Sequence, residues 1–133
     1  TIATTLLCTA IIFSASAEED PFDFVPPSAD LKSGDEQKTP ARIKAKSGWK
    51  WNKEYPASVT VSVDGPCEAN PTKLGQGGKK IEVDGSDAVL PLTLKGKSSG
   101  NAKITLTANF SICNEETCKI FRKKVFAFPV TIK

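Results

Sequence analysis

The sequence predicts an all-β fold in the form of an antiparallel β-sandwich, on two observations. In the second part of the chain, apolar side chains recur at every second position, which is the period of a half-buried strand. Clusters of glycine, aspartate, proline and serine separate these runs, and such clusters are typical of turns. No segment of this part keeps a helical period, so frequent short strands indicate two packed antiparallel sheets.

The first 17 residues have the pattern of a cleavable signal peptide. Residues 2–13 form an apolar run that is shorter than the roughly 20 residues of a membrane-spanning helix. The run is followed by Ala15, Ser16 and Ala17, a cleavage site of the small-x-small kind, and then at once by acidic residues. We therefore expect export and no stable membrane span after cleavage. The alternative is an uncleaved membrane anchor.

Residues 18–40 have the composition of a disordered, proline-containing acidic tether. They hold seven acidic residues, two lysines and four prolines. Segments with high charge and low hydrophobicity do not bury enough apolar surface to fold. Phe22, Phe24 and Val25 are an exception, and the alternative is that they dock on the domain or on a partner.

Residues 41–133 form the predicted domain, which we assign to the immunoglobulin-like sandwich class. Six runs alternate, and Pro91 and Pro129 within them indicate sheet edges or bulges, because proline donates no ladder hydrogen bond. Turns are expected at 64–66, 75–78, 84–87 and 96–101. The residues expected to face the core are Ala41, Ile43 and Ala45; Val59, Val61 and Val63; Ile81 and Val83; Ala88, Leu90, Leu92 and Leu94; Ile104, Leu106, Ala108, Phe110 and Ile112; and Phe126, Phe128, Val130 and Ile132.

The charge distribution narrows the classes of function. Residues 41–133 carry 16 lysines or arginines and eight acidic residues, a net charge of +8, which favours acidic partners, anionic polymers or a membrane face. The lysines are scattered singly, so nucleic acid is not expected. The chain has no histidine, the commonest general base and metal ligand. We expect a monomer without cofactor or metal.

The cysteines are the most informative residues for chemistry. Cys113 and Cys118 flank four polar residues between two strand runs, so in a hairpin they can face each other. In a non-hydrogen-bonded antiparallel pair the Cα atoms lie about 4.5 Å apart, at the short end of the range that a disulfide tolerates. Alternation from Ile104 to Ile112 puts Cys113 on the face opposite to the core. Cys67 is then left as a free thiol or for an intermolecular bond, or it pairs instead with Cys113 or Cys118.

A bridge that closes so short a loop removes little chain entropy. It is therefore either a candidate for exchange chemistry or one of the structural disulfides that exported domains often carry. The local residues do not decide between these two interpretations.

Two motifs in this order resemble the N-terminal domain family of the bacterial thiol:disulfide interchange protein DsbD. The first is residues 49–59, with two tryptophans, an asparagine and a Tyr-Pro pair; the second is the strand at 109–113 with its cysteine pair. The resemblance covers about residues 39–133. It implies an immunoglobulin-like sandwich in the periplasm, where Cys113 and Cys118 exchange electrons with a thioredoxin-like partner. It also implies that Cys118 takes the partner's attack and that Cys113 resolves the mixed disulfide.

Residues around the pair have two interpretations each. Trp49, Trp51 and Tyr55 are candidates to cap and shield the pair, or they pack at the edge of the core. The four cations within 119–124 would favour the thiolate form of a nearby cysteine, and the two glutamates of the loop would oppose it. The alternative is that the cations form a solvated strand face.

Two functions from different classes follow. The first is a periplasmic thiol-disulfide exchange domain, which would be a redox domain of the protein-disulfide reductase type. The second is a non-catalytic exported binding module, with a structural disulfide and a basic surface. The first requires a bridge that mild reductants open, and the second predicts a bridge that is indifferent to them.

Overall fold

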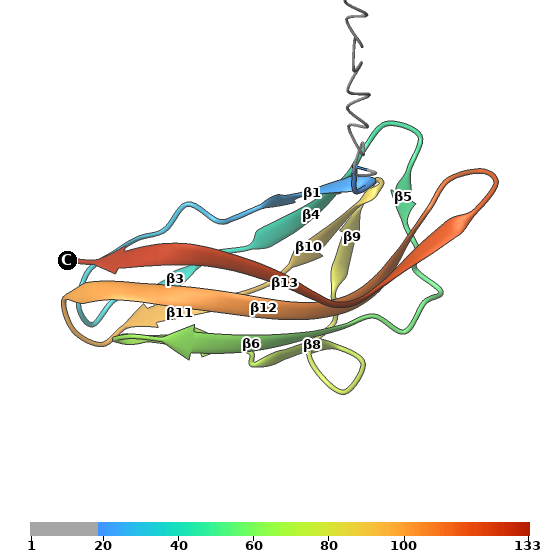
Figure 1. The fold of residues 1–133 in the computed structure, drawn as a ribbon. Coiled ribbons are helices and arrows are strands. Elements are labelled where there is room, and N and C mark those ends of the chain that lie inside the picture. Colours follow the sequence, from blue (N-terminus) through green and yellow to red (C-terminus); the bar gives the residue numbers. More distant parts are fainter. Residues whose placement is uncertain (1–18) are drawn as a thin grey trace, which may run out of the picture.

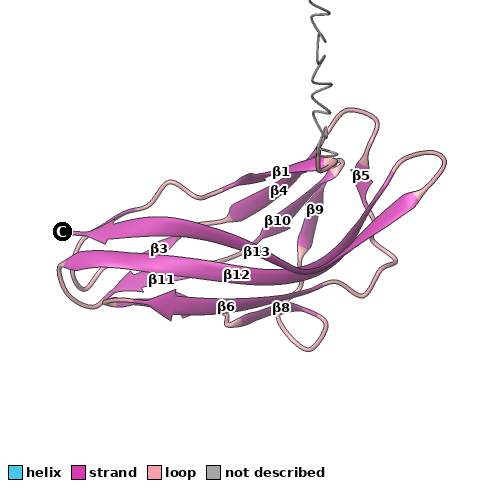
Figure 2. Ribbon diagram, in the orientation of Figure 1, coloured by secondary structure: helices cyan, strands magenta, loops and turns pink. Residues whose placement is uncertain are grey.

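The computed structural model describes residues 19–133, which form strands joined by loops and turns (Figures 1 and 2). The predicted all-β fold is confirmed for these residues. Within 19–133 there is no helix long and apolar enough to cross a membrane. The predicted signal peptide at residues 1–17 lies outside the described residues.

One layer of the sandwich is a long sheet built on the hairpin of the last two strands (Figure 1). Its strand order is β2-β13-β12-β6-β8, and β5 pairs with the end of β12 beyond β6. All its pairs are antiparallel except β13 with β2. The bounds are β2 (Asp30–Leu31), β5 (Lys50–Trp51), β6 (Ser58–Asp64), β8 (Lys73–Gly75), β12 (Gly100–Cys113) and β13 (Cys118–Ile132).

The second layer consists of two short antiparallel sheets, with orders β1-β4-β10-β9 and β3-β11-β7. The chain passes from one sheet to the other twice, at Pro40 and at Pro91, each of which lacks the N–H that a continuous ladder needs. The predicted run 88–94 is therefore divided at Pro91. The bounds are β1 (Phe22–Val25), β3 (Glu36–Lys38), β4 (Ala41–Ala45), β7 (Cys67–Asn70), β9 (Glu82–Asp84), β10 (Asp87–Leu90) and β11 (Thr93–Gly96).

The core lies between the layers and uses most of the predicted inward residues. On β12 the alternate residues from Ile104 to Ile112 are all fully buried, as are Ile43 on β4 and Leu90 on β10. The predicted alternation is therefore confirmed for these strands. In the run 79–83 it is wrong for Val83, which is 37% exposed on the exposed strand β9, whereas Ile81 is partly buried against the core. β9 is an edge strand, paired only with β10 among the described strands.

The predicted disordered tether is wrong for the part of 18–40 that the structure describes. β1 pairs with β4 over four residues, and Phe22 is only 4% exposed. Its ring makes edge-on contacts with Phe110, Phe121 and Phe126 of the opposite layer, at centroid distances of 5.1, 5.0 and 5.9 Å. The alternative, docking on the domain, is the one that the structure has for Phe22 and Phe24, whereas Val25 is 43% exposed. The two aromatic side chains bury enough apolar area to order the segment.

A β-bulge interrupts the β12–β13 hairpin and decides which way its tip faces. The register moves from Ala108 opposite Lys124 to Phe110 opposite Phe121, so one residue of β12 faces two of β13. Lys123 takes a φ of 52°, and its N–H donates to the Asn109 side-chain oxygen at 3.0 Å. The extra residue reverses the alternation of β13, so Phe121 reaches the core and Cys118 points away from it.

The docking of β1 leads to a prediction about stability. Substitution Phe22→Ala should lower the free energy of unfolding by about 3–4 kcal/mol, because it empties a site enclosed by three other rings. The exposed neighbour substitution Asp23→Ala should change it by less than about 0.5 kcal/mol. Urea denaturation measures both, and equal midpoints for the two variants would show that this segment does not dock.

Candidate functional site

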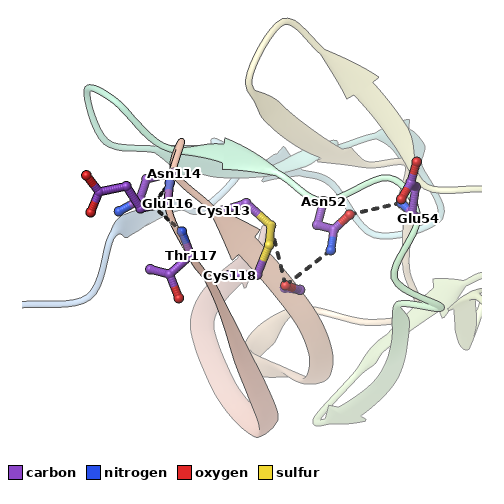
Figure 3. Close-up of a disulfide and its surroundings, with 8 residues drawn as sticks. Asn52, Glu54, Cys113, Asn114, Glu116, Thr117 and Cys118 are labelled. Atoms are coloured by element: carbon purple, nitrogen blue, oxygen red, sulfur yellow. Dashed lines mark hydrogen bonds between the residues drawn. A yellow bond between two sulfur atoms is a disulfide. The ribbon is translucent and has the colours of Figure 1, made fainter.

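Cys113 and Cys118 form a disulfide at the end of the longest hairpin (Figure 3). They are the last residue of β12 and the first of β13, and they are direct partners in the ladder. Their Cα atoms are 4.0 Å apart. The predicted pairing is thus the one that the structure has, and Cys67 is not part of it.

The loop between the two cysteines is held by Asn114. Its side-chain oxygen accepts hydrogen bonds from the N–H groups of Glu116 and Thr117, at 2.8 and 2.7 Å, and its own N–H donates to the Thr117 carbonyl at 2.8 Å. An asparagine that bonds to the backbone two or three residues ahead builds a turn by itself. The hairpin therefore brings the two cysteines together without needing the bridge.

The two sulfur-bearing residues differ sharply in exposure. Cys113 is 7% exposed, whereas Cys118 is an exposed residue. The difference arises from their neighbours, because β5 pairs with β12 beside Cys113 and the outer side of Cys118 has no ladder partner among the described residues. An incoming group therefore meets Cys118 first.

A short chain of polar side chains lies behind Cys113 (Figure 3). The Asn52 amide nitrogen donates to the Ser111 hydroxyl at 3.4 Å, and that hydroxyl lies 3.9 Å from the Cys113 sulfur. The Asn52 amide oxygen accepts the Glu54 N–H at 3.1 Å, which fixes the orientation of the amide. A hydroxyl in this place can donate to a Cys113 thiolate.

The turn between β9 and β10 supports this side of the site. The Ser86 carbonyl accepts the Trp51 N–H at 2.8 Å, so the turn holds β5 beside β12. Arg42 anchors the turn through Asp84 and Asp87, at 2.9 and 3.0 Å. These two carboxylates raise the pKa of the Arg42 guanidinium, which stays charged at any working pH.

Two shallow cavities open beside Cys113. One, of about 410 Å³, is lined by Asn52, Ser86 and Cys113 among others, and the other, of about 300 Å³, by Trp49, Ser86 and Cys113. Lys50 lines both. The buried sulfur therefore lies next to polar, partly basic recesses and not under a continuous apolar lid.

The three aromatic residues predicted to cap the pair are placed differently from one another. Trp49 is half-buried and shares a cavity with Cys113. Trp51 is 5% exposed and its ring stacks on Phe110 at 5.3 Å, as in the alternative of core packing, and Trp51 also lines the 410 Å³ cavity with Cys113. Tyr55 lines a separate groove that contains neither cysteine of the pair.

The cations that follow Cys118 also differ from one another in position and contacts. Lys119 points to the inner side, where its ammonium lies 5.5 Å from the Trp49 ring centre. Lys124 lies beyond the bulge and pairs with Asp20 at 2.9 Å. Arg122 and Lys123 are exposed at the bulge. Neither Lys119 nor Lys124 is therefore directed at the bridge.

Cys67 is a buried free thiol on β7, in the other layer of the sandwich. Burial raises the pKa of the Cys67 thiol, so the folded protein holds its proton more tightly than the unfolded chain does. Its contribution to stability is present below the ordinary thiol pKa and is lost as the pH rises through the folded value. Such a thiol is a poor nucleophile at neutral pH.

Sequence reasoning missed two residues of this site. Ser111 was not singled out, although its position two residues before Cys113 on a strand places both on one face. Ser86 gave no local signal, because it reaches the site only through the turn between β9 and β10. In the described part of the chain, no cluster of three or more possible metal-ligating side chains occurs.

The chain matches no family model and no curated protein.

The Asn114 turn gives a prediction about the bridge. Asn114→Ala should make the bridge easier to reduce by about 0.5–1 kcal/mol, or roughly 10–20 mV, because the reduced hairpin would no longer hold one thiol opposite the other. Thr117→Ala keeps the N–H that Asn114 binds and is the matched control. A glutathione redox series measures both, and an unchanged midpoint for Asn114→Ala would show that the ladder alone aligns the cysteines.

Proposed function

We propose that this chain is an exported thiol-disulfide exchange domain that passes electrons through Cys113 and Cys118 to or from a thioredoxin-like partner in the bacterial periplasm. The observation that supports it most is the difference in exposure across the bridge. The bridge joins one buried and one exposed cysteine at a hairpin tip whose turn is built by Asn114. An exchange site needs one sulfur that a partner's thiolate can reach and a second sulfur that is shielded from other reactants.

The exchange proceeds in two displacements. A thiolate of the reduced partner attacks the Cys118 sulfur, the bond to Cys113 breaks, and Cys113 leaves as a thiolate. The partner's second thiolate then attacks the partner sulfur that is bonded to Cys118. A disulfide forms within the partner, and Cys118 is released as a thiolate. The partner ends as a disulfide, two electrons and two protons having moved to this chain. In the opposite direction, Cys118 attacks the partner's disulfide and Cys113 resolves the mixed disulfide.

Ser111 and Asn52 support the leaving group in this scheme. The Cys113 thiolate forms where water has little access, and burial alone disfavours a charged sulfur. The Ser111 hydroxyl, oriented by Asn52, donates to it and makes Cys113 a better leaving group. The lysine at position 50, which lines both cavities beside Cys113, adds a favourable positive charge.

A redox titration tests the proposal. Cys113 and Cys118 should open together in a glutathione series, at a potential well above about −300 mV, with alkylation and mass mapping to identify both residues. Cys67 should stay unmodified in the folded protein, because it is buried and protonated. A bridge that remains closed down to about −300 mV belongs with structural disulfides and would refute the proposal.

A groove elsewhere on the domain favours a second candidate, a non-catalytic binding module. The groove, of about 690 Å³, lies between the edge strands β8 and β9 and is lined by Tyr55, Ile81 and the exposed side chains of Lys53 and Lys80, among others. A Cβ at Gly75, where φ is 79°, would overlap the Ala57 carbonyl, so the wall requires glycine. A bridge indifferent to reductant would leave this candidate standing.

A further inference from the structure

The groove between β8 and β9 is a cavity that the exchange chemistry does not use. Its volume of about 690 Å³ lies within the range of small-molecule sites, about 300–1,000 Å³, and neither Cys113 nor Cys118 lines it. β8 ends the strand order of the long sheet, and β9 ends that of a sheet in the other layer (Figure 1). The groove therefore lies where the two layers of the sandwich end.

The inner part of the groove is apolar and belongs to the core packing. Trp51 is 5% exposed and Ala57 is 9% exposed. Tyr55 and Ile81 are partly buried against the core. Val83, which is 37% exposed on β9, continues this apolar surface. An apolar group of a ligand would therefore contact side chains that the fold already holds in place.

The outer wall of the groove is the loop at 75–79, and backbone hydrogen bonds fix it. The Gly75 N–H donates to the Lys79 carbonyl at 2.7 Å, and the Gln76 N–H donates to the Ala57 carbonyl at 2.9 Å. The loop is thus tied both to itself and to the residues that precede β6. The groove is formed without a ligand, as small-molecule sites usually are.

The charged side chains that line the groove are both positive. They are Lys53 and Lys80, and both are exposed. Neither has an ion-pair partner among the described residues. Glu54, next to Lys53 in the sequence, lines the cavity beside Cys113 and not this groove.

The acidic residues of β9 do not offset these two lysines within the groove. Glu82 lies between Ile81 and Val83, which both line the groove. Successive side chains of an extended chain point to opposite sides, so Glu82 points away from the groove. Asp84 is paired with Arg42 at 2.9 Å. The groove therefore combines an apolar floor with two cations that lack an acidic partner.

We propose that this groove binds an apolar carboxylate, an organic acid whose hydrocarbon or aromatic body lies on Ile81 and Val83 and whose carboxylate lies at Lys53 and Lys80. A singly charged carboxylate loses less hydration over an apolar floor than a phosphate group of higher charge does. A free acid and the C-terminus of a peptide share this chemistry. The inference rests on the second candidate function, a binding module, and not on exchange at the bridge.

Binding is tested by NMR titration of the full chain with its bridge oxidised. Octanoate should shift the backbone amide signals of residues 75–83. Octanamide keeps the same apolar body without the charge, and it should bind about tenfold more weakly. Acetyl-leucyl-phenylalanine with a free C-terminus is the second acid. Tighter binding of this peptide than of octanoate would assign the groove to a peptide end, and the reverse would assign it to a free acid.

The role of the two lysines is tested by charge removal. The double variant Lys53→Gln, Lys80→Gln should weaken octanoate binding by about tenfold and abolish the preference over octanamide. The matched control is Lys38→Gln, Lys103→Gln, which removes two exposed charges outside the groove. It should keep the wild-type affinity to within about twofold, because exposed charges at a distance are screened by salt.

The apolar floor is tested with Val83→Ser. This variant should weaken octanoate and octanamide by a similar factor, about threefold, because both probes place the same hydrocarbon on it. Its urea midpoint should stay close to that of the wild type, since Val83 is an exposed residue. An unchanged affinity for both probes would show that the hydrocarbon does not lie on β9.

The remaining outcomes separate this proposal from exchange at the bridge. Equal affinities for octanoate and octanamide, signal shifts confined to residues outside the groove, or equal weakening in the two double variants would each overturn it. None of these results bears on the exchange proposal, because binding is measured with the bridge closed. A bridge that resists reduction would refute exchange and leave the carboxylate site standing.

Discussion

The packing around Phe110 is the constraint on which the rest of the molecule depends. Its ring contacts Phe22 from β1, Trp51 from β5 and two rings of β13, so one side chain joins both layers and three separate parts of the chain. The stack on Trp51 holds β5 beside the end of β12, and β5 in turn covers Cys113. The burial of one sulfur therefore follows from an aromatic contact on the opposite face of the same strand.

Much of the fold could be predicted from the period-2 alternation of apolar residues. The strands that it did not predict correctly depart from it for physical reasons. β4, β6, β12 up to Phe110 and the second half of β13 bury one face more than the other, so their sequences alternate and were predicted. Strand β1 was not predicted, and docking of its two aromatics on the domain was only the alternative, because side chains in an acidic segment reach their partners only in three dimensions. Strand β9 alternates like a buried strand but lies at an edge. Alternation shows which residues can share a face, and not what covers it.

The candidate site also has a part that the sequence predicted and a part that it did not. The pairing of Cys113 with Cys118 was predictable from a four-residue polar loop between two strands. Their unequal exposure was not, because it depends on β5 and on the bulge at Asn109, where a β13 residue takes positive φ. Lys123 is not a residue type that marks such a position. Of the predicted aromatic cap, Trp49 and Trp51 each line a cavity with Cys113, Trp51 while its ring stacks on Phe110, whereas Tyr55 lines neither of these cavities.

The central claim is that attack occurs at Cys118 and that Cys113 leaves. It is tested most directly by single-cysteine variants treated with glutathione disulfide, with mass spectrometry to measure the adduct. Cys113→Ser, which keeps the exposed thiol, should form the mixed disulfide rapidly, whereas Cys118→Ser, which keeps the buried one, should react at least about tenfold more slowly. Equal rates, or faster reaction of Cys118→Ser, would contradict the account.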